Sequence, residues 1–487
     1  YAKIGFVCSH YTQYIKEDKI MNSKDNRSSF SGKIGFVLSA AGASVGLGNI
    51  WRFPYLAAKD GGGLFIIIYL ILSVTFGFTL IITEVAIGRK TKKGPLSAYK
   101  SLHKKSGFLG FLVTIVPMII LPYYCAIGGW VIKYFVGFIT GQGVSMAEDG
   151  YFTGFITSTA EPLIYMFIFL GICALIILQG VVKGIEKLSK FLMPILLILV
   201  VIIAIFSLTL SHTDPDGTTR TGLDGLKILF IPDFSNVTPG SFLSVLVDAM
   251  GQLFYSLSVA MGIMVAYGSY VKDDENISKS VGRIEIFDTI IAILAGVMII
   301  PAVYSFMGAD GLSASGPGLM FIYLPKVFAA MGSWGNIIGV IFFAMVLFAA
   351  ITSAISILEA IVSSFMDEFS ISRYKATIIE TIIAGAVAIV VCLGYNVWYF
   401  EAVLPNGTTG QVLDILDYVS NNILMPIVAI ITCILIGWIL GPKTIINEVE
   451  KCGIQMSRTK LYVVMIKFIA PILLAILFLK AIGLIMI

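Results

Sequence analysis

Apolar residues fill long stretches of this chain, and short polar segments separate them. A helix that crosses a bilayer needs about 20 predominantly apolar residues. Eleven stretches meet this requirement: residues 34–57, 63–88, 108–140, 161–179, 187–210, 241–270, 283–307, 334–366, 376–395, 412–440 and 461–485. The pattern predicts an all-α polytopic membrane protein with about eleven transmembrane helices, which we number as spans one to eleven.

Span one contains residues that a membrane helix normally avoids. Between Gly42 and Pro54 it holds three glycines, Asn49 and Arg52. Glycines alone are also typical of a helix-packing face, but Asn49, Arg52 and Pro54 are costly in hydrocarbon. Irregular backbone at that depth is tolerated where it lines a cavity. In such a cavity, the freed carbonyl groups can bind a cation, and the N-terminus of a half-helix attracts a carboxylate. We therefore interpret the break as the floor of an ion-coupled binding site.

A weak internal repeat supports this interpretation. Ser44-Val-Gly-Leu-Gly48 in span one resembles Ser258-Val-Ala-Met-Gly262 in span six. These are corresponding spans of a five-plus-five inverted repeat, the arrangement of secondary transporters whose substrate lies between paired broken helices. We expect a cytoplasmic tail over residues 1–33, a ten-helix core with broken helices 1 and 6 over residues 34–440, and a cytoplasmic loop with the eleventh helix over residues 441–487.

Composition excludes several other classes of protein. The chain is 57% hydrophobic and 13% charged, with a mean hydropathy of +0.94, whereas soluble domains carry about 25% charged residues. The net charge of +4 gives no case for nucleic acid as a partner. The six cysteines show no CxxC spacing and the three histidines are scattered, so neither a metal centre nor a catalytic triad is predicted.

Lysine and arginine gather on one side of the predicted membrane. The loop over residues 89–105 has seven of them, and three more lie between spans four and five, whereas residues 141–160 have none. Because positively charged loops stay in the cytoplasm, we predict a cytoplasmic N-terminus. The chain opens on Tyr1, and Met21 precedes a short basic tail, so we expect residues 1–20 to be dispensable.

Hydroxyl and carboxyl groups within the spans are the candidate chemistry. Thr352 and Ser353 are adjacent in span eight and offer hard oxygen ligands for a small monovalent cation, although such hydroxyls often bond to their own helix. The acids within the spans lack the paired spacing that catalysis needs, so we predict no enzyme, and we expect Glu84 to hydrogen-bond to backbone. An ion channel stays the alternative, but no repeated filter sequence is present.

The motifs together resemble the neurotransmitter:sodium symporter family. The resemblance rests on span one with Gly61-Gly-Gly63, on Gly184-Ile-Glu-Lys-Leu-Ser-Lys, on Gly316-Pro-Gly-Leu and on Ala-Ile-Thr352-Ser353, in order over residues 24–485. With eleven spans instead of twelve, the chain is similar to the bacterial amino-acid transporters of this family, which lie in the inner membrane. The resemblance implies Na⁺-coupled symport of a hydrophobic or aromatic L-amino acid by alternating access, without chloride. A symporter for another small carboxylate-bearing solute is the second alternative.

The resemblance also implies site residues. A first Na⁺ would be held by the Ser44 carbonyl, Asn49, Ser256 and Asp288, and a second by Gly42, Val45, Ala349, Thr352 and Ser353. The substrate carboxylate would meet Tyr124 and backbone amides near Leu47. Gly46 stands where monoamine transporters carry an aspartate, so the substrate must bring its own carboxylate. The implied substrate-binding residues are Ala43, Ser44, Leu47, Gly48, Ile120, Tyr124, Tyr255, Ser256, Ser258, Met261, Ser353, Ala354 and Ile357.

Two gates follow from the same resemblance. Arg52 and Asp417 would form the outer pair, with Tyr255 as an aromatic lid above the substrate. The inner side would be closed by Arg27, Asp367, Phe30 and Tyr270. Phe30 stands where a tryptophan is usual, which implies a looser inner latch.

Overall fold

Helices make up nearly all of the computed structural model, which describes residues 29–214, 216–235 and 238–485. Six membrane helices are continuous over most of their length, although one is kinked at Gly308 and another follows a π-helical turn. They are α7 (Gly107–Ile139), α10 (Glu161–Leu178), α11 (Lys187–Leu208, preceded by the π-helix η4, Val181–Glu186), α15 (Ile277–Gly311), α18 (Ser333–Phe369) and α19 (Arg373–Leu393).

The other membrane segments are interrupted. Span one consists of α2 (Lys33–Ser44), η1 (Gly48–Arg52) and α3 (Phe53–Lys59), with a bend of 53° at the break. Span six consists of α13 (Pro239–Ser256) and α14 (Ile263–Ser269). The remaining spans contain π-helical turns: α4 (Gly63–Leu72), η2 (Ser73–Gly77) and α5 (Phe78–Thr91); α20 (Val412–Asp417), η6 (Tyr418–Leu424), α21 (Met425–Ile434) and η7 (Leu435–Ile439); α23 (Thr459–Val464), η9 (Met465–Ile469) and α24 (Ala470–Ala481).

The expected eleven helices are not all found as continuous spans. In the described part of the chain, nine helices are long and apolar enough to cross a membrane, and the bent pair in span one makes ten. The stretch over residues 241–270 differs because it divides into α13 and α14 around a break at residues 257–262. Polar residues such as Asp248 and Gln252 also lower the apolar content of α13.

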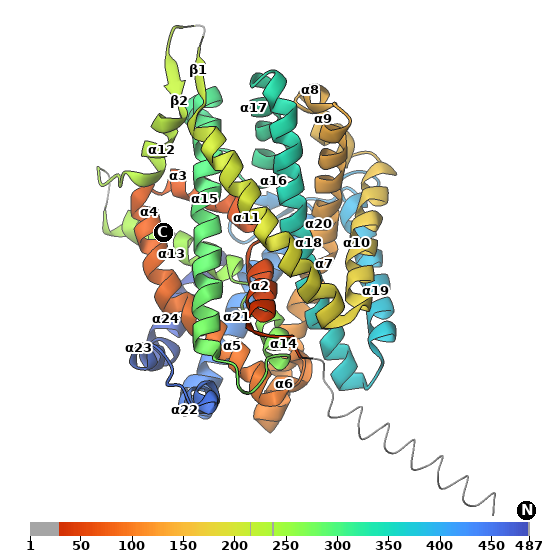
Figure 1. Cartoon of the computed structure of the whole chain (residues 1–487), viewed down its shortest axis with the longest axis vertical. Helices are drawn as coiled ribbons and strands as arrows, with labels where there is room; N and C mark the ends of the chain where they lie inside the picture. The colour runs from red at the N-terminus through yellow and green to blue at the C-terminus, as the bar shows by residue number, and fades with distance from the viewer. Residues whose placement is uncertain (1–28, 215, 236–237, 486–487) are drawn as a thin grey trace, which may run out of the picture.

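Short elements cover the two ends of the helix bundle. The end that holds α6 (Pro95–Leu102), η3 (Lys104–Ser106), α14, α22 (Lys443–Val449) and η8 (Glu450–Cys452) lies at the bottom of Figure 1, and we call it the lysine-rich end. At the opposite end lies the hairpin of β1 (Ser211–Thr213) and β2 (Thr219–Thr221), which defines the hairpin end (Figure 1). The other short elements are α8 (Gly143–Met146), α9 (Tyr151–Ile156), α12 (Gly222–Phe230), α16 (Gly316–Gly318), η5 (Leu319–Tyr323), α17 (Leu324–Ala330), β3 (Ala402–Val403) and β4 (Thr409–Gly410).

Two glycines let α5 and α14 pack backbone to backbone. A Cβ atom on Gly88 would lie 2.0 Å from the carbonyl oxygen of Val265, and one on Gly268 would lie 2.3 Å from the carbonyl oxygen of Val85. Real Cβ atoms do not approach so closely, so both positions require glycine. This contact fixes the second half of span six against span two and so places the break in span six.

Candidate functional site

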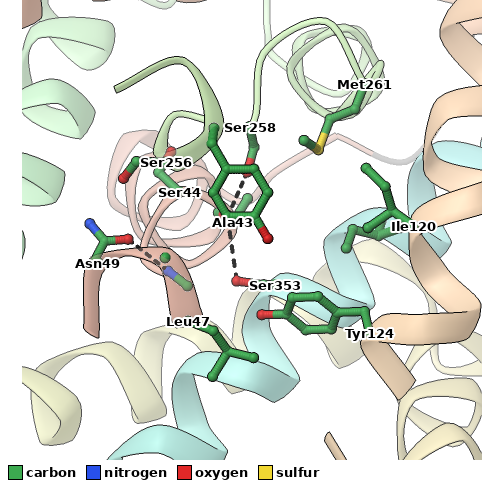
Figure 2. A pocket seen from close by; sticks show the side chains of 14 residues that line it. Ala43, Ser44, Leu47, Asn49, Ile120, Tyr124, Ser256, Ser258, Met261 and Ser353 are labelled. Atoms are coloured by element: carbon green, nitrogen blue, oxygen red, sulfur yellow. Dashed lines mark hydrogen bonds between the residues drawn. The ribbon is translucent and has the colours of Figure 1, made fainter. Parts of the chain in front are cut away.

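The breaks in spans one and six face each other at the centre of the bundle. In span six the backbone takes left-handed conformations at Ser258 (φ 53°), Ala260 (φ 64°) and Gly262 (φ 75°). The Ser258 hydroxyl donates to the Ala43 carbonyl at 2.8 Å, and the Gln252 amide donates to the Gly48 carbonyl at 3.1 Å. Figure 2 shows Ser258 over the end of α2. Side chains of span six therefore supply donors to backbone carbonyls at the break in span one.

Glu84 of α5 supports the break in span six from behind. The Ala260 backbone N–H donates to its Oε1 atom at 2.6 Å, and Glu84 is buried. The expected hydrogen bond from Glu84 to backbone is confirmed. It satisfies an N–H group that no helical carbonyl can reach, which backbone within a bilayer requires.

Two of the residues expected at the first cation site converge on the carboxylate of a third, Asp288. Asp288 Oδ1 accepts from the Asn49 amide at 2.8 Å and from the Ser256 hydroxyl at 2.8 Å. Tyr69 donates to Asp288 Oδ2 at 3.4 Å, and Asn49 Oδ1 accepts from the Gly46 N–H at 3.1 Å. The sequence did not indicate Tyr69, because a tyrosine in an apolar span resembles an ordinary core residue. One carboxylate among neutral oxygens fits a monovalent cation.

The residues expected at the second cation site also come together. The Ser353 hydroxyl lies 3.4 Å from the Gly42 carbonyl oxygen and 3.3 Å from that of Val45. Thr352 packs on Gly42, where a Cβ would lie 3.2 Å from Thr352 Cβ. The Thr352 hydroxyl donates to the Phe348 and Ala349 carbonyls at 2.9 and 3.1 Å. These are bonds to its own helix, which the sequence left open as an alternative to cation binding. Its lone pairs are not used by these bonds, so this cluster of neutral oxygens also fits a small monovalent cation.

A cavity of about 30 Å³ lies between the breaks. Its walls are formed by Ala43, Ser44, Gly46, Leu47, Gly48, Asn49, Ile120, Tyr124, Tyr255, Ser256, Ser258, Met261, Ser353 and Ile357 (Figure 2). All expected substrate-binding residues line it except Ala354, which is buried elsewhere because it follows Ser353 on α18 and points to another face of that helix. The cavity is smaller than an amino acid, so a substrate must displace some of these side chains.

Tyr124 and Gly46 define the polar side of this cavity. The Tyr124 hydroxyl is buried and makes no hydrogen bond of normal geometry with any described residue. A Cβ on Gly46 would lie 3.0 Å from Ser353 Oγ and 3.6 Å from the Tyr124 hydroxyl. A side chain at position 46 would therefore contact both groups and require a small shift of Ser353.

A second cavity of about 170 Å³ lies next to the first one, on its side toward the hairpin end. Leu47, Tyr124 and Tyr255 line both cavities and therefore separate them. Arg52 and Asp417 line the second cavity, but they do not form the expected ion pair. Asp417 Oδ1 instead accepts from Tyr123 at 3.0 Å and from Asn421 at 2.6 Å, which satisfies the carboxylate across the cavity from Arg52.

Aromatic rings close the site toward the lysine-rich end. The Phe30 N–H donates to the Tyr270 carbonyl at 3.1 Å, and the two rings meet edge to face with centroids 6.2 Å apart. The Tyr270 hydroxyl donates to Glu359 Oε1 at 2.5 Å, and Arg373 binds both oxygens of Glu359. Asp367 accepts from the Gly94 N–H.

Two outcomes concern the predicted inner gate. Arg27 lies outside the described residues. The sequence did not indicate Arg373, although a lone arginine at the start of α19 is an available partner for the buried Glu359.

Comparisons with known proteins agree with this arrangement. The model of the sodium:neurotransmitter symporter family matches residues 27–144 and 153–485. The chain is 33% identical to an uncharacterized sodium-dependent transporter, YhdH, of Bacillus subtilis over 93% of this chain and 97% of that protein. It is 30% identical to an uncharacterized sodium-dependent transporter of Haemophilus influenzae over 93% and 98%.

A solved structure shares the fold. The crystal structure of MhsT in complex with L-phenylalanine superposes with a TM-score of 0.81 at 33% identity, over 94% of this chain and all of that one. Fold and relatives are those of transporters, not of enzymes, and the protein is a multi-pass membrane protein that depends on sodium. The chain belongs to the sodium:neurotransmitter symporter family.

Proposed function

We propose that the protein carries a hydrophobic or aromatic L-amino acid into the cell together with Na⁺. The observation that carries this proposal is the buried, unpaired Tyr124 hydroxyl in a cavity whose other walls are mostly apolar. The Tyr124 hydroxyl and the N-terminus of η1 suit a carboxylate. Lys, Arg, Asp or Glu side chains would be desolvated there without a partner, at a cost of several kcal/mol. A relative crystallised with L-phenylalanine adds support.

Two Na⁺ ions would flank the substrate. The first would be bound by Ser44, Asn49, Ser256 and Asp288 and would also meet the substrate carboxylate. The second would be bound by Gly42, Val45, Ala349, Thr352 and Ser353. The first ion would contact the substrate, and the second would lie between α2 and α18. Ion binding would therefore be linked to closure of these helices around the cavity.

Transport would follow alternating access with the lysine-rich end in the cytoplasm of a bacterial inner membrane. The outer gate would consist of Arg52, Asp417 and Tyr255, and the inner gate of Arg27, Asp367, Phe30 and Tyr270. Residues 34–440 would form the transporting core, and residues 441–487 a cytoplasmic loop with the last helix. Because Arg52 and Asp417 line one cavity without touching, the outer pair would form as that cavity closes.

Chloride would not be needed. Chloride-dependent relatives carry asparagine where this chain has Asp288, and the fixed carboxylate supplies the negative charge. Uptake into proteoliposomes is expected to be equal in chloride and gluconate buffers. Strong stimulation by chloride would contradict this assignment.

The deciding experiment is uptake of radiolabelled leucine or tryptophan into proteoliposomes with an inward Na⁺ gradient. Accumulation above equilibrium is expected with Na⁺ and none with K⁺ or choline. A channel would only equilibrate the label. Unlabelled apolar amino acids should compete, whereas competition by small carboxylates without an apolar side chain would favour the alternative substrate class.

A further inference from the structure

Four lysines gather where α6 meets α7 at the lysine-rich end. Lys93 precedes α6, Lys100 lies on it, and Lys104 and Lys105 belong to η3. All four are exposed, and the stem of Lys100 runs along the start of α7, 3.8 Å from the position of a Cβ on Gly107. We call these four residues the lysine corner.

Two exposed phenylalanines follow the lysine corner along α7. The exposed fraction is 65% for Phe108 and 52% for Phe111, and the two lie one turn apart on the same face. Exposed apolar rings on a membrane helix contact lipid, and lysines beyond them lie at the depth of the headgroups. The lysine corner therefore lies at headgroup depth, above an apolar surface.

The positive charge of the lysine corner is mostly uncompensated. Lys93 donates to the neutral Ser101 hydroxyl at 3.0 Å, and Lys100 lies 3.7 Å from Glu368, whose other oxygen accepts from Ser97. Among the described residues, Lys104 and Lys105 have no ion-pair partner. In the part of the chain that the structure describes, only one partly engaged carboxylate thus lies within ion-pair distance of any of the four ammonium groups.

Two other lysines at the same end share one aspartate. Lys92 and Lys451 bind the two oxygens of Asp273 at 3.0 and 2.7 Å. The hydrogen bond from Lys451, with the contribution of Lys92, lowers the pKa of Asp273 to about 2. Lys272 and Lys279 flank the acidic residues 273–275. The lysine corner therefore has fewer acids beside it than the cluster around Asp273, and exposed apolar rings lie next to it.

We propose that the lysine corner binds the headgroup of an anionic phospholipid, with the acyl chains lying over Phe108 and Phe111. The lipid phosphate carries a negative charge that lysine ammonium groups attract as point charges. This site is separate from the proposed substrate and sodium sites, and it does not rest on the transport proposal.

Native mass spectrometry of the purified full chain tests the proposal. The protein is exchanged into micelles with equal amounts of phosphatidylglycerol and phosphatidylcholine, and the bound lipids are counted. Preferential retention of phosphatidylglycerol is expected. Replacing Lys100, Lys104 and Lys105 with Gln should lower the phosphatidylglycerol-to-phosphatidylcholine ratio by at least tenfold, because each lysine near anionic lipid contributes about 1 kcal/mol.

Matched variants show whether the lysine corner or the two phenylalanines select the anionic lipid. Replacing Lys272, Lys279 and Lys460 with Gln removes the same charge elsewhere at this end and should leave the ratio unchanged. Replacing Phe108 and Phe111 with Ala should lower retention of both lipids alike. A ratio unchanged by the first triple variant, or lowered equally by both triples, would overturn the proposal. So would displacement of phosphatidylglycerol by glycerol 3-phosphate, which would identify a site for soluble phosphate.

Discussion

The cation sites depend on how a few side chains share their donors and acceptors. Asn49 uses both ends of its amide, because Nδ2 donates to Asp288 while Oδ1 accepts from the Gly46 N–H. Ser256 and Tyr69 add donors to the same carboxylate. A buried carboxylate without such partners would be strongly destabilising. The fixed orientation of Asn49 also ties the break in span one to α15, so a cation bound at Asp288 would act on the cavity that we propose for the substrate.

Thr352→Val tests whether the Thr352 hydroxyl oxygen belongs to the second cation site. Valine keeps the volume of threonine but removes the hydroxyl, which donates to the Phe348 and Ala349 carbonyls. The apparent affinity for Na⁺ in uptake assays is expected to fall severalfold or more. Thr381→Val is the matched control, since the Thr381 hydroxyl only donates to the Thr377 carbonyl of its own helix at 2.7 Å. A sodium dependence that is unchanged in Thr352→Val would remove this residue from the site.

Met261→Phe tests which side chain limits substrate size. Met261 lines the small cavity, and an unbranched methionine repacks easily to admit an aromatic ring. Phenylalanine cannot move aside in the same way, so tryptophan should bind more weakly by about 1–3 kcal/mol, by analogy with overpacked cores. Leucine and alanine should be less affected. Competition assays would show a changed order of inhibitors, and an unchanged order would mean that Met261 does not face the substrate.

At the scale of elements, the break in span six is held in a strained form. Ser258 and Ala260 are not glycines, yet both have positive φ angles, and each such residue costs about 1–3 kcal/mol. The strain persists because Ser258 bonds to Ala43 and because Glu84 holds the Ala260 N–H. Span two therefore supports a binding loop that span six could not maintain alone.

Two substitutions of Glu84 separate hydrogen bonding from charge. Glu84→Gln keeps an oxygen that accepts from the Ala260 N–H, so transport should be largely retained. Glu84→Ala leaves that N–H without a partner, which costs about 1–3 kcal/mol. Thermal melting and uptake measured together should show a loss for the alanine variant alone. Equal losses in both variants would mean that the charge of Glu84 matters instead.

The sequence predicted the elements whose residues conflict with a membrane environment. Asn49 and Arg52 in an apolar stretch are costly, so the break in span one was predictable from sequence alone. Tyr69 was not, because nothing in its apolar neighbourhood distinguishes a hydrogen-bonding tyrosine from a packed one. The predicted pair of Arg52 and Asp417 is not formed here, because whether two gate residues touch depends on the conformation of the whole transporter.

At the scale of the whole molecule, the two sides of the substrate cavity differ. Toward the lysine-rich end, Phe30 is only 2% exposed and packs against Tyr267 and Tyr270. Toward the hairpin end, the 170 Å³ cavity extends to Tyr255. The side chains of Leu47, Tyr124 and Tyr255 separate it from the small cavity. A buried aromatic cluster therefore covers the lysine-rich side, whereas three side chains separate the two cavities on the hairpin side, which suits the alternating access that we propose.

Arg89 joins three parts of the lysine-rich end that are distant in sequence. Its side chain is fully buried, and Nε lies 2.9 Å from Glu448 Oε1 of α22. Nη1 donates to the Glu275 carbonyl at 2.7 Å, and Nη2 donates to the Glu448 carbonyl. Span two is thus connected both to the loop after α14 and to the segment between spans ten and eleven.

Breaking this connection should destabilise the whole molecule. Arg89→Met leaves the Glu448 carboxylate buried without its partner, at a cost of about 3–5 kcal/mol. The double variant Arg89→Met, Glu448→Met removes both charges and should recover most of that loss in thermal melting of the purified protein. Lys90→Met changes the exposed neighbour and should have little effect. If the double variant melts as low as Arg89→Met, the backbone carbonyls that Arg89 holds, not the ion pair, keep these three parts together.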